Sequence, residues 1–547
     1  MRIYYYYGLD EHRRKNSQGL DYTPAYLPAL LTFLGVSAKR CTAEMLPGLD
    51  AGDCLLIGAD TLPAYPENAG AVITLGTGIG SQKAAAHREK RVFAHLLYGS
   101  KRLPLFVPVE KPMFSGGDIL YEAETEDGTR LPAVVRCSRQ RYGFCFDLAA
   151  SIWFSEDGFQ SGPAHGFFMG RVPNTRPLPE KYPTDTAYND LLLGILENIL
   201  RTLGTPMLGK LPPLPDGRVP DFAFCVSGDD DYTSASYNLR AAEVLCGLGI
   251  PYHINVMPGG DSFIITQEED RQLQELGCEI ALHADFTVQP YSEEGYLASA
   301  DCFCRRFGRK SLTVTNHCFI QDGETAERLR WVSACGLLAD NSKLGEIDSN
   351  DINAYNLSGF AFGTSFPRMV CDDAAHGNVP LSALEIPINY YEPRLSPPAG
   401  PYPAPEKITD YIDGAAENGR IAQFFLHPHY LGSALSEAPW GENVPWAIAA
   451  LQCAKAHWEQ KNYHPLLTSV DEIARFWHAR ADARITETDK GWKISSEVPV
   501  VLELPFPTHF IQIDGTPTAV CEKTICGEKR YLITVPEGDH IVTGVIQ

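Results

Sequence analysis

Between residues 221 and 480 the chain repeats one pattern, in which a short apolar run is followed by a segment with helical spacing of apolar residues. The run 222–228 (FAFCVSG) has the length and composition of a buried strand. The segment 236–249 (SYNLRAAEVLCGLG) places Leu239 and Ala242 on one face of a helix. Roughly seven or eight such strands, each followed by a helix or a loop, predict a parallel α/β barrel.

The pattern changes on both sides of this region. Residues 1–209 alternate helical segments with buried apolar runs, which is typical of a doubly wound α/β sheet, and the Pro-rich segment 210–220 (KLPPLPDGRVP) is predicted as a linker. From residue 485 apolar and polar residues alternate between Gly and Pro turns. We therefore predict an N-terminal α/β domain over 1–209, a barrel over 210–484 and a small β-rich domain over 485–547.

Composition excludes several classes of protein. A chain of 547 residues is too long for one hydrophobic core, and a formal charge of -22 argues against sequence-independent binding of nucleic acid. The sequence has neither a secretory signal nor an apolar run long enough to span a membrane, so we expect a cytoplasmic protein without a membrane partner. The 15 cysteines form no C-x-x-C pair, which favours buried thiols over disulfides or a structural zinc site.

Polar side chains gather where the predicted barrel strands end. In a parallel barrel these ends converge on one mouth, so residues there can share a site. Adjacent carboxylates repel each other unless a cation lies among them, and imidazole and carboxylate together suit zinc and similar ions. The pattern therefore predicts a divalent metal site. Its candidate residues are Asp229, Asp230, Asp231, His283, His317, Asp340, His427 and His429.

Three segments that contain these candidate residues carry a resemblance to a known family. The stretches 227–231 (SGDDD), 278–287 (CEIALHADFT) and 424–430 (FFLHPHY) are similar to the Asp-Asp, histidine and Leu-His motifs of the polysaccharide deacetylase superfamily. This family is also called the NodB-homology or carbohydrate esterase family four. The resemblance covers residues 221–480 and implies a distorted (β/α)7–8 NodB-like barrel.

The resemblance also implies an activity and a set of roles. It implies that Asp229 is the catalytic base, Asp230 and His283 are metal ligands, and His427 is the general acid. The metal, with zinc favoured over cobalt, nickel, manganese or iron, would polarise an amide or ester carbonyl. The expected substrate is an amino sugar or another saccharide, from which an acyl group, with acetyl favoured, is hydrolysed.

Several positions depart from the family pattern. Thr287 stands where the family has its second ligand histidine, and we expect His317 to take that place. Asp231 stands where the family has a glycine, and the arginine that steadies the family's base has no match. The resemblance gives no role to Asp231, Asp340 or His429. These remaining polar residues at strand ends are reserve candidates for the site.

The N-terminal region faintly resembles glutamine amidotransferase-like or flavodoxin-like domains. That amidotransferase activity needs a cysteine on a tight G-x-C-x-G turn, which the sequence lacks. Cys54 lies inside an apolar run, and Gly76, Gly78 and Gly80 have the spacing of a turn rather than that of a dinucleotide site. We expect a non-catalytic scaffold.

Two other functions stay open at this point. One is a glycoside hydrolase on the same barrel, with Asp229 and Asp340 as its pair of carboxylates. The other is a catalytically inactive relative that binds carbohydrate, in which the missing family histidine and arginine record lost activity.

Overall fold

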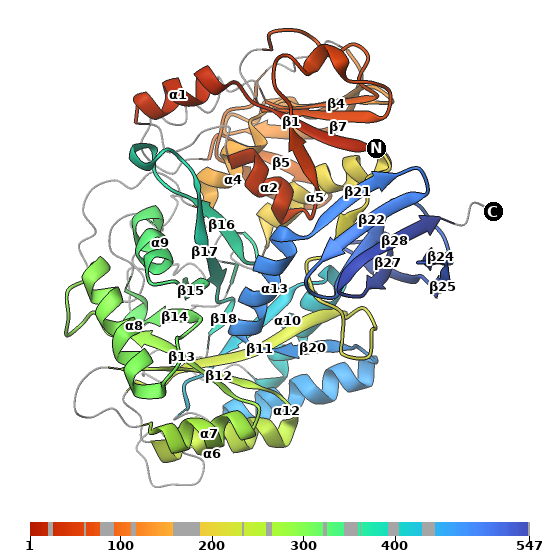
Figure 1. The fold of residues 1–547 in the computed structure, drawn as a ribbon. Helices are drawn as coiled ribbons and strands as arrows, with labels where there is room; N and C mark the ends of the chain where they lie inside the picture. The colour runs from red at the N-terminus through yellow and green to blue at the C-terminus, as the bar shows by residue number, and fades with distance from the viewer. Residues whose placement is uncertain are drawn as a thin grey trace.

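The structure is a computed structural model with three β regions. Figure 1 shows the N-terminal sheet at the top, the barrel strands and helices below it, and the C-terminal strands in blue at one side. The residues that it describes are 1–19, 26–58, 62–76, 92–110, 116–156, 186–231, 235–258, 265–320, 325–343, 359–360, 363–391, 404–428 and 444–544.

The N-terminal region is built on a nine-stranded sheet in the order β2-β1-β3-β4-β9-β8-β7-β5-β6. Its strands are β1 (Arg2–Tyr6), β2 (Ala38–Arg40), β3 (Asp53–Ile57), β4 (Ala71–Leu75), β5 (Ala94–Tyr98), β6 (Lys101–Leu105), β7 (Asp118–Thr125), β8 (Arg130–Ser138) and β9 (Arg141–Phe144). The helices of this region are α1 (Leu9–Ser17), α2 (Tyr26–Phe33), α4 (Leu148–Glu156) and α5 (Tyr188–Thr202).

Only half of this sheet follows the doubly wound pattern that we expected. The strands β2, β1, β3, β4 and β9, in that order, pair in parallel. The strands β8, β7, β5 and β6 extend the sheet by antiparallel pairing. Short connections between neighbouring strands favour this antiparallel pairing. Cys54 is fully buried in the core, as predicted, and Gly76 has a φ of 93°. Gly78 and Gly80 lie outside the described residues.

The barrel is a curled ten-stranded sheet in the order β16-β17-β15-β14-β13-β12-β11-β19-β18, with β20 beside β11. All neighbouring strands pair in parallel except β16 and β17. The strands are β11 (Phe222–Asp229), β12 (Tyr252–Val256), β13 (Glu279–Ala284), β14 (Thr313–Asn316), β15 (Ala339–Lys343), β16 (Arg368–Cys371), β17 (Pro380–Pro387), β18 (Tyr390–Tyr391), β19 (Ile421–Phe425) and β20 (Pro465–Thr468).

Helices cover the outside of this sheet (Figure 1). They are α6 (Ala235–Leu248), α7 (Gln267–Glu275), α8 (Glu293–Phe307), α9 (Thr325–Ala334), α10 (Ile408–Asn418) and α12 (Val444–Lys461). By contrast, α13 (Val470–Asp482) packs in the hydrophobic cluster that contains the inward-facing residues Ala223 and Cys225 of β11. The predicted alternation of strands and helices is therefore confirmed, and the described strands form a curled half-barrel.

The strand β11 is the centre of the curled sheet. It pairs with β19 along one side, while its other side pairs with β20 over residues 222–225 and with β12 over residues 226–229. Phe222, Phe224 and Val226 pack in the apolar cluster beneath the helices. Because side chains alternate along a strand, Asp229 points to the inner side of the sheet, and so does Ser227.

The C-terminal strands form two antiparallel sheets. One has the order β10-β23-β27-β26 and the other the order β21-β22-β28-β24-β25. The strands are β10 (Met207–Leu208), β21 (Arg484–Thr488), β22 (Gly491–Ser496), β23 (Val500–Leu504), β24 (Phe510–Ile513), β25 (Thr516–Ala519), β26 (Cys521–Ile525), β27 (Glu528–Val535) and β28 (Gly538–Gly544). β10 immediately precedes the predicted linker. Its pairing with β23 therefore ties the start of the linker to the C-terminal sheet.

A buried arginine connects the three regions. Arg480, on α13, donates hydrogen bonds to the carbonyl oxygens of Gly209, Thr32, Phe33 and Leu208, at distances of 2.7, 3.0, 3.0 and 3.0 Å. One hydrophobic cluster likewise includes residues from the N-terminal sheet, the barrel and the C-terminal strands. The regions are packed together, and the domain boundaries at 209/210 and 484/485 stay predictions.

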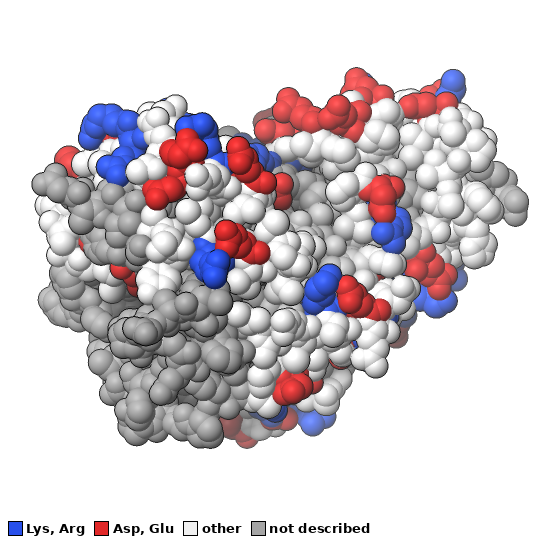
Figure 2. Space-filling view, turned by 90° about the horizontal axis from the view of Figure 1, so that it is seen from below, with Lys and Arg blue, Asp and Glu red and all other residues white. Residues whose placement is uncertain are grey.

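Acidic and basic side chains are interspersed on the surface. Figure 2 shows the face seen from below Figure 1, on which small groups of both signs lie among uncharged residues. Among the described residues, no helix is both apolar enough and long enough to cross a membrane. All 15 cysteines are free thiols.

Candidate metal centre

The end of β11 separates its three carboxylates. Asp229 points to the inner side of the curled sheet, and the alternation of the strand turns Asp230 to the other side. Asp231 has a φ of 42°, a left-handed conformation that aspartate tolerates better than most residues. This turn of the backbone brings the carboxylate of Asp231 back beside that of Asp229.

His283, near the end of β13, completes a compact cluster with these two acids. Asp229, Asp231 and His283 each offer a ligand atom, and these atoms lie within 4.8 Å of one another. The Nε2 atom of His283 is 3.3 Å from Oδ1 of Asp231 and 3.5 Å from Oδ2 of Asp229. Its Nδ1 atom lies 2.8 Å from the carbonyl oxygen of Thr315. A carbonyl can only accept, so Nδ1–H donates there and Nε2 faces the two carboxylates.

Two further histidines turn towards Asp231. The Nε2 atom of His317 lies 3.7 Å from Oδ1 of Asp231, and the Nε2 atom of His427 lies 3.3 Å from Oδ2. The rings of His283 and His317 meet edge to face, with their centroids 5.4 Å apart. The predicted residues Asp229, His283, His317 and His427 are therefore brought together around Asp231.

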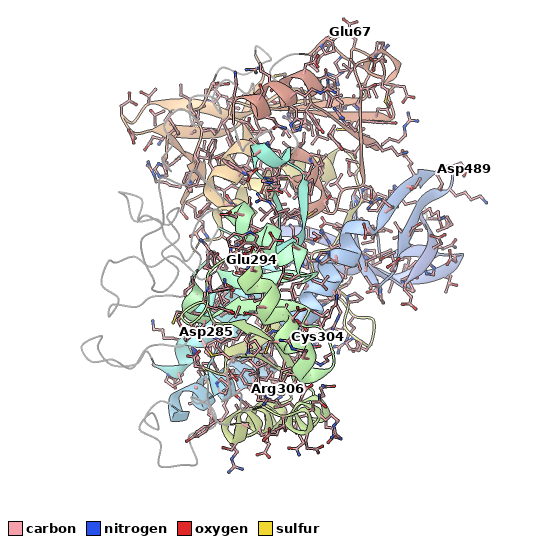
Figure 3. All side chains as sticks on the ribbon, turned by 60° about the vertical axis from the view of Figure 1, so that its left-hand side comes forward. Glu67, Asp285, Glu294, Cys304, Arg306 and Asp489 are labelled. Atoms are coloured by element: carbon pink, nitrogen blue, oxygen red, sulfur yellow. The ribbon has the colours of Figure 1, made fainter. Side chains whose placement is uncertain are left out.

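Asp285 holds His317 in this orientation. Its Oδ1 atom lies 3.0 Å from Nδ1 of His317, so that Nε2 of the same ring faces Asp231. The same oxygen accepts hydrogen bonds from the backbone N–H and the hydroxyl of Thr287, at 2.9 and 2.5 Å. Thr287, at the position where the sequence resemblance led us to expect a histidine, thus supports His317 indirectly. Figure 3 labels Asp285 in the barrel, on the side away from Asp489 of the C-terminal strands.

Sequence reasoning missed both Asp285 and a second supporting residue, Asn255. The Nδ2 group of Asn255 donates to Oδ1 of Asp229 at 2.8 Å. An asparagine within the apolar run of β12, and an aspartate two residues after His283, were the available signals. Neither residue type identifies its hydrogen-bond partner in the sequence, because each contact joins two different strands or loops.

Asp230 has different surroundings. Its Oδ1 atom accepts a hydrogen bond from the backbone N–H of Met257 at 3.2 Å, and burial raises the pKa of its carboxyl group to about 7. Among the described residues it belongs to no cluster with metal-ligand spacing. The ligand role expected for Asp230 stays a prediction.

The reserve candidates Asp340 and His429 do not join the described site. Asp340 lies on β15, and its Oδ1 atom accepts from Nη1 of Arg328 at 3.0 Å and from the backbone N–H of Ser342 at 2.7 Å. Arg328 belongs to α9, so Asp340 faces the helices outside the sheet, whereas the next residue, Asn341, bonds to Gln423. His429 lies outside the described residues.

The charges at the site compensate one another. Burial alone would raise the pKa of Asp231, but His427 and His283 outweigh it and hold that pKa well below its usual value. Burial likewise opposes protonation of His317, yet the hydrogen bond to Asp285 raises its pKa to about 10. Protons on imidazoles therefore balance the carboxylates here, and a bound cation would displace such protons.

The donor set fits a divalent cation. One or two imidazole Nε2 atoms and a carboxylate are ligands that zinc and related metals use in proteins. The Nδ1 atoms of His283 and His317 each have an oxygen partner, an arrangement that is common for metal-binding histidines because it fixes the ring and its tautomer.

No protein-family model matches the chain, and no curated protein matches its sequence. Among solved structures, it is similar to a protein assigned as a polysaccharide deacetylase from Mycobacterium smegmatis, with a TM-score of 0.33 and 14% identity over 50% of this chain and 96% of that one. A family 4 acetyl xylan esterase from Clostridium thermocellum, in complex with a cobalt ion, has a TM-score of 0.25 and 12% identity over 46% and 91%. A family 4 carbohydrate esterase from Streptomyces lividans has a TM-score of 0.25 and 10% identity over 45% and 92%. These values describe a likeness over about half of the chain and establish no function.

Gly228 allows His427 to lie beside β11. The backbone N–H of Leu426 donates to the carbonyl oxygen of Ser227 at 2.7 Å, and the hydroxyl of Tyr252 donates to the carbonyl oxygen of Leu426. A Cβ atom at position 228 would lie 1.8 Å from that same oxygen. Only glycine permits this approach, which positions the residue after Leu426.

We predict that Gly228→Ala lowers the free energy of unfolding by about 1–3 kcal/mol, because the added methyl group displaces the backbone of Leu426. Chemical denaturation of the full chain measures the change. The matched control is Gly247→Ala in α6, where a Cβ meets nothing within 4 Å and alanine is the better helix former. Equal stability of Gly228→Ala and the parent chain would contradict the close approach.

Proposed function

We propose that this protein is a metal-dependent hydrolase that removes an acyl group, with acetyl favoured, from an amino sugar or another saccharide. The observation that supports the metal-dependent chemistry most strongly is the convergence of three histidine Nε2 atoms on Asp231, with Asp229 alongside. The saccharide class rests on the sequence resemblance to polysaccharide deacetylases.

In this proposal Asp231, His283 and His317 hold the metal. The geometry favours Asp231 over Asp230 as the carboxylate ligand, because Oδ1 of Asp231 lies 3.3 and 3.7 Å from the Nε2 atoms of His283 and His317, whereas Oδ1 of Asp230 accepts from the backbone of Met257. When bound, a divalent cation would polarise the scissile carbonyl and promote ionisation of water near neutral pH.

Asp229 is the proposed general base. Burial raises the pKa of its carboxyl group, which makes it a stronger acceptor for the proton of the attacking water than an exposed aspartate. Asn255 fixes Oδ1 through its 2.8 Å hydrogen bond, so that Oδ2 is the oxygen directed at the cluster. Asn255 thereby supplies the orientation that an arginine provides in the family.

His427 is the proposed general acid. His427 follows β19, whereas His283 lies on β13, which is next to β12. Because β19 and β12 pair with opposite sides of β11, Nε2 of His427 approaches Asp231 from the side opposite to His283. A proton held on Nε2 is therefore available to a departing amine or alkoxide on that side of the site.

The glycoside hydrolase alternative finds no support in this geometry. It needs a second carboxylate across the mouth from Asp229, and Asp340 instead forms an ion pair with Arg328 on the helix side of the sheet. The inactive carbohydrate-binding alternative is separated from hydrolysis by the kinetic test below.

We predict that Asp231→Asn removes one bound Zn2+ per chain, or weakens that site by more than about 100-fold, because a ligand is lost. Asp230→Asn is the matched control and should retain the ion. Equilibrium dialysis of chelator-stripped protein against buffered Zn2+ measures both. The opposite outcome, with loss only in Asp230→Asn, would assign the ligand to Asp230 and contradict our choice.

For hydrolysis, Asp229→Asn should lower kcat on acetylated amino sugars by about 10²–10⁴-fold with a smaller change in KM, because proton transfer to the base is lost. The released acetate is measured, and circular dichroism checks the fold. Asp413→Asn, which changes an acid paired with His457 on α10 and α12, is the control with full activity expected. Unchanged turnover in Asp229→Asn would remove its role as base, and a parent chain inactive on every acylated saccharide would favour the inactive binder.

A further inference from the structure

A second cluster of ionisable side chains lies at the opposite end of the barrel strands. His253 is the second residue of β12, Glu279 is the first of β13, and Asp471 lies in the first turn of α13. Each offers a ligand atom, and these atoms lie within 4.8 Å of one another. The strands are parallel, so their first residues mark the end of the sheet away from Asp229. We call these three residues the floor cluster.

The hydrogen bonds around His253 fix its orientation. The hydroxyl of Thr313 donates to Oδ1 of Asp471 at 2.6 Å, so its oxygen is left to accept from Nε2–H of His253, 3.5 Å away. When the ring is neutral, Nδ1 of His253 then carries the lone pair. The side chain of His253 is fully buried, and its Nδ1 atom has no hydrogen-bond partner among the described residues.

This lone pair faces a carboxylate. The Nδ1 atom of His253 lies 3.9 Å from Oε2 of Glu279, which is too long for a hydrogen bond. Nδ1 and the carboxylate therefore need a positive charge between them in this buried site, either a proton on Nδ1 or a bound cation. Two ligands of a zinc ion, each at about 2 Å from it, lie roughly 3.3 Å apart in a tetrahedral site. Bringing the two atoms about 0.6 Å closer would therefore let one ion bridge them.

Second contacts complete the arrangement. The hydroxyl of Ser469, which caps α13, donates to Oε2 of Glu279, and Thr313 connects the far nitrogen of His253 to Asp471. Such outer hydrogen bonds orient metal-binding imidazoles and carboxylates. They also join the beginning of α13 to β13 and β14.

We propose that His253, Glu279 and Asp471 bind a second divalent cation of the zinc class, which fastens the first turn of α13 to β12 and β13. This site is structural, because it lies at the end of the strands away from the proposed active site. It does not depend on the proposed hydrolase function, since its residues are separate from those around Asp231.

A third cluster in the described residues provides the contrast. Asp372, Asp373 and His376 also have metal-ligand spacing, but Arg330 donates to both carboxylates at 2.6 Å. There the guanidinium contacts both carboxylates, whereas in the floor cluster Arg475 lies 3.4 Å from Oε1 of Glu279 only, and Nδ1 of His253 has no hydrogen-bond partner among the described residues. Asp373 is therefore a matched control for Asp471.

The test uses the full chain with its mouth site disabled by Asp231→Asn and His283→Gln. After removal of metal with a chelator, dialysis against Zn2+ should restore about one ion per chain and raise the melting temperature. Adding Asp471→Asn should abolish both the bound ion and the rise in melting temperature, whereas adding Asp373→Asn should change neither.

Cobalt(II) in place of zinc identifies the ligands. A nitrogen and oxygen site gives visible absorption without a sulfur-to-metal charge-transfer band, and this is the expected result for the mouth-disabled protein. Binding of no ion to that protein, retention of the ion in the Asp471→Asn variant, or a sulfur band that points to cysteine ligands would each overturn the proposal. Because the mouth-disabled protein keeps the floor cluster intact, its stoichiometry and spectrum decide the question even if Asp471→Asn fails to fold.

Discussion

Three consecutive carboxylates at the end of a buried strand are stable only where positive charge compensates them. In this protein the compensation comes from histidines that reach Asp229 and Asp231 from three other segments of the barrel, ending at β13, β14 and β19. Parallel strands that end at one edge make this convergence possible. The proposed metal centre satisfies the same constraint, because a divalent cation that displaces imidazole protons would compensate the same carboxylates.

The surrounding residues fix the direction of each group. Thr315 and Asp285 hold the Nδ1 atoms of His283 and His317, while Asn255 holds Asp229. Gly228 admits the carbonyl of Leu426 and so places His427 next to β11. The site is thus positioned mainly by strands and by hydrogen bonds to their ends, which favours a preorganised geometry.

The sequence predicted the elements well where the hydrophobic pattern is regular. The strand expected at 222–228 is β11, Phe222–Asp229, and the helix expected over 236–249 is α6, Ala235–Leu248. It did not predict the antiparallel half of the N-terminal sheet, because pairing partners are long-range and apolar runs carry no direction.

For the site, the residue types at strand ends pointed to the residues that the structure brings together, but not to their mutual orientation. Which of Asp230 and Asp231 faces the histidines depends on strand alternation and on the left-handed backbone at Asp231. The supporting roles of Asp285 and Asn255 depend on contacts between segments far apart in the chain, which no single-sequence pattern records.

The proposed cation lies between Asp231 and the histidines at the mouth of the barrel. Anomalous scattering from crystals of the full chain grown with Zn2+, recorded on both sides of the zinc absorption edge, tests this placement most directly. We expect an anomalous peak within bonding distance of Asp231, His283 and His317. Strong zinc peaks elsewhere in the molecule, with none among these three side chains, would contradict it.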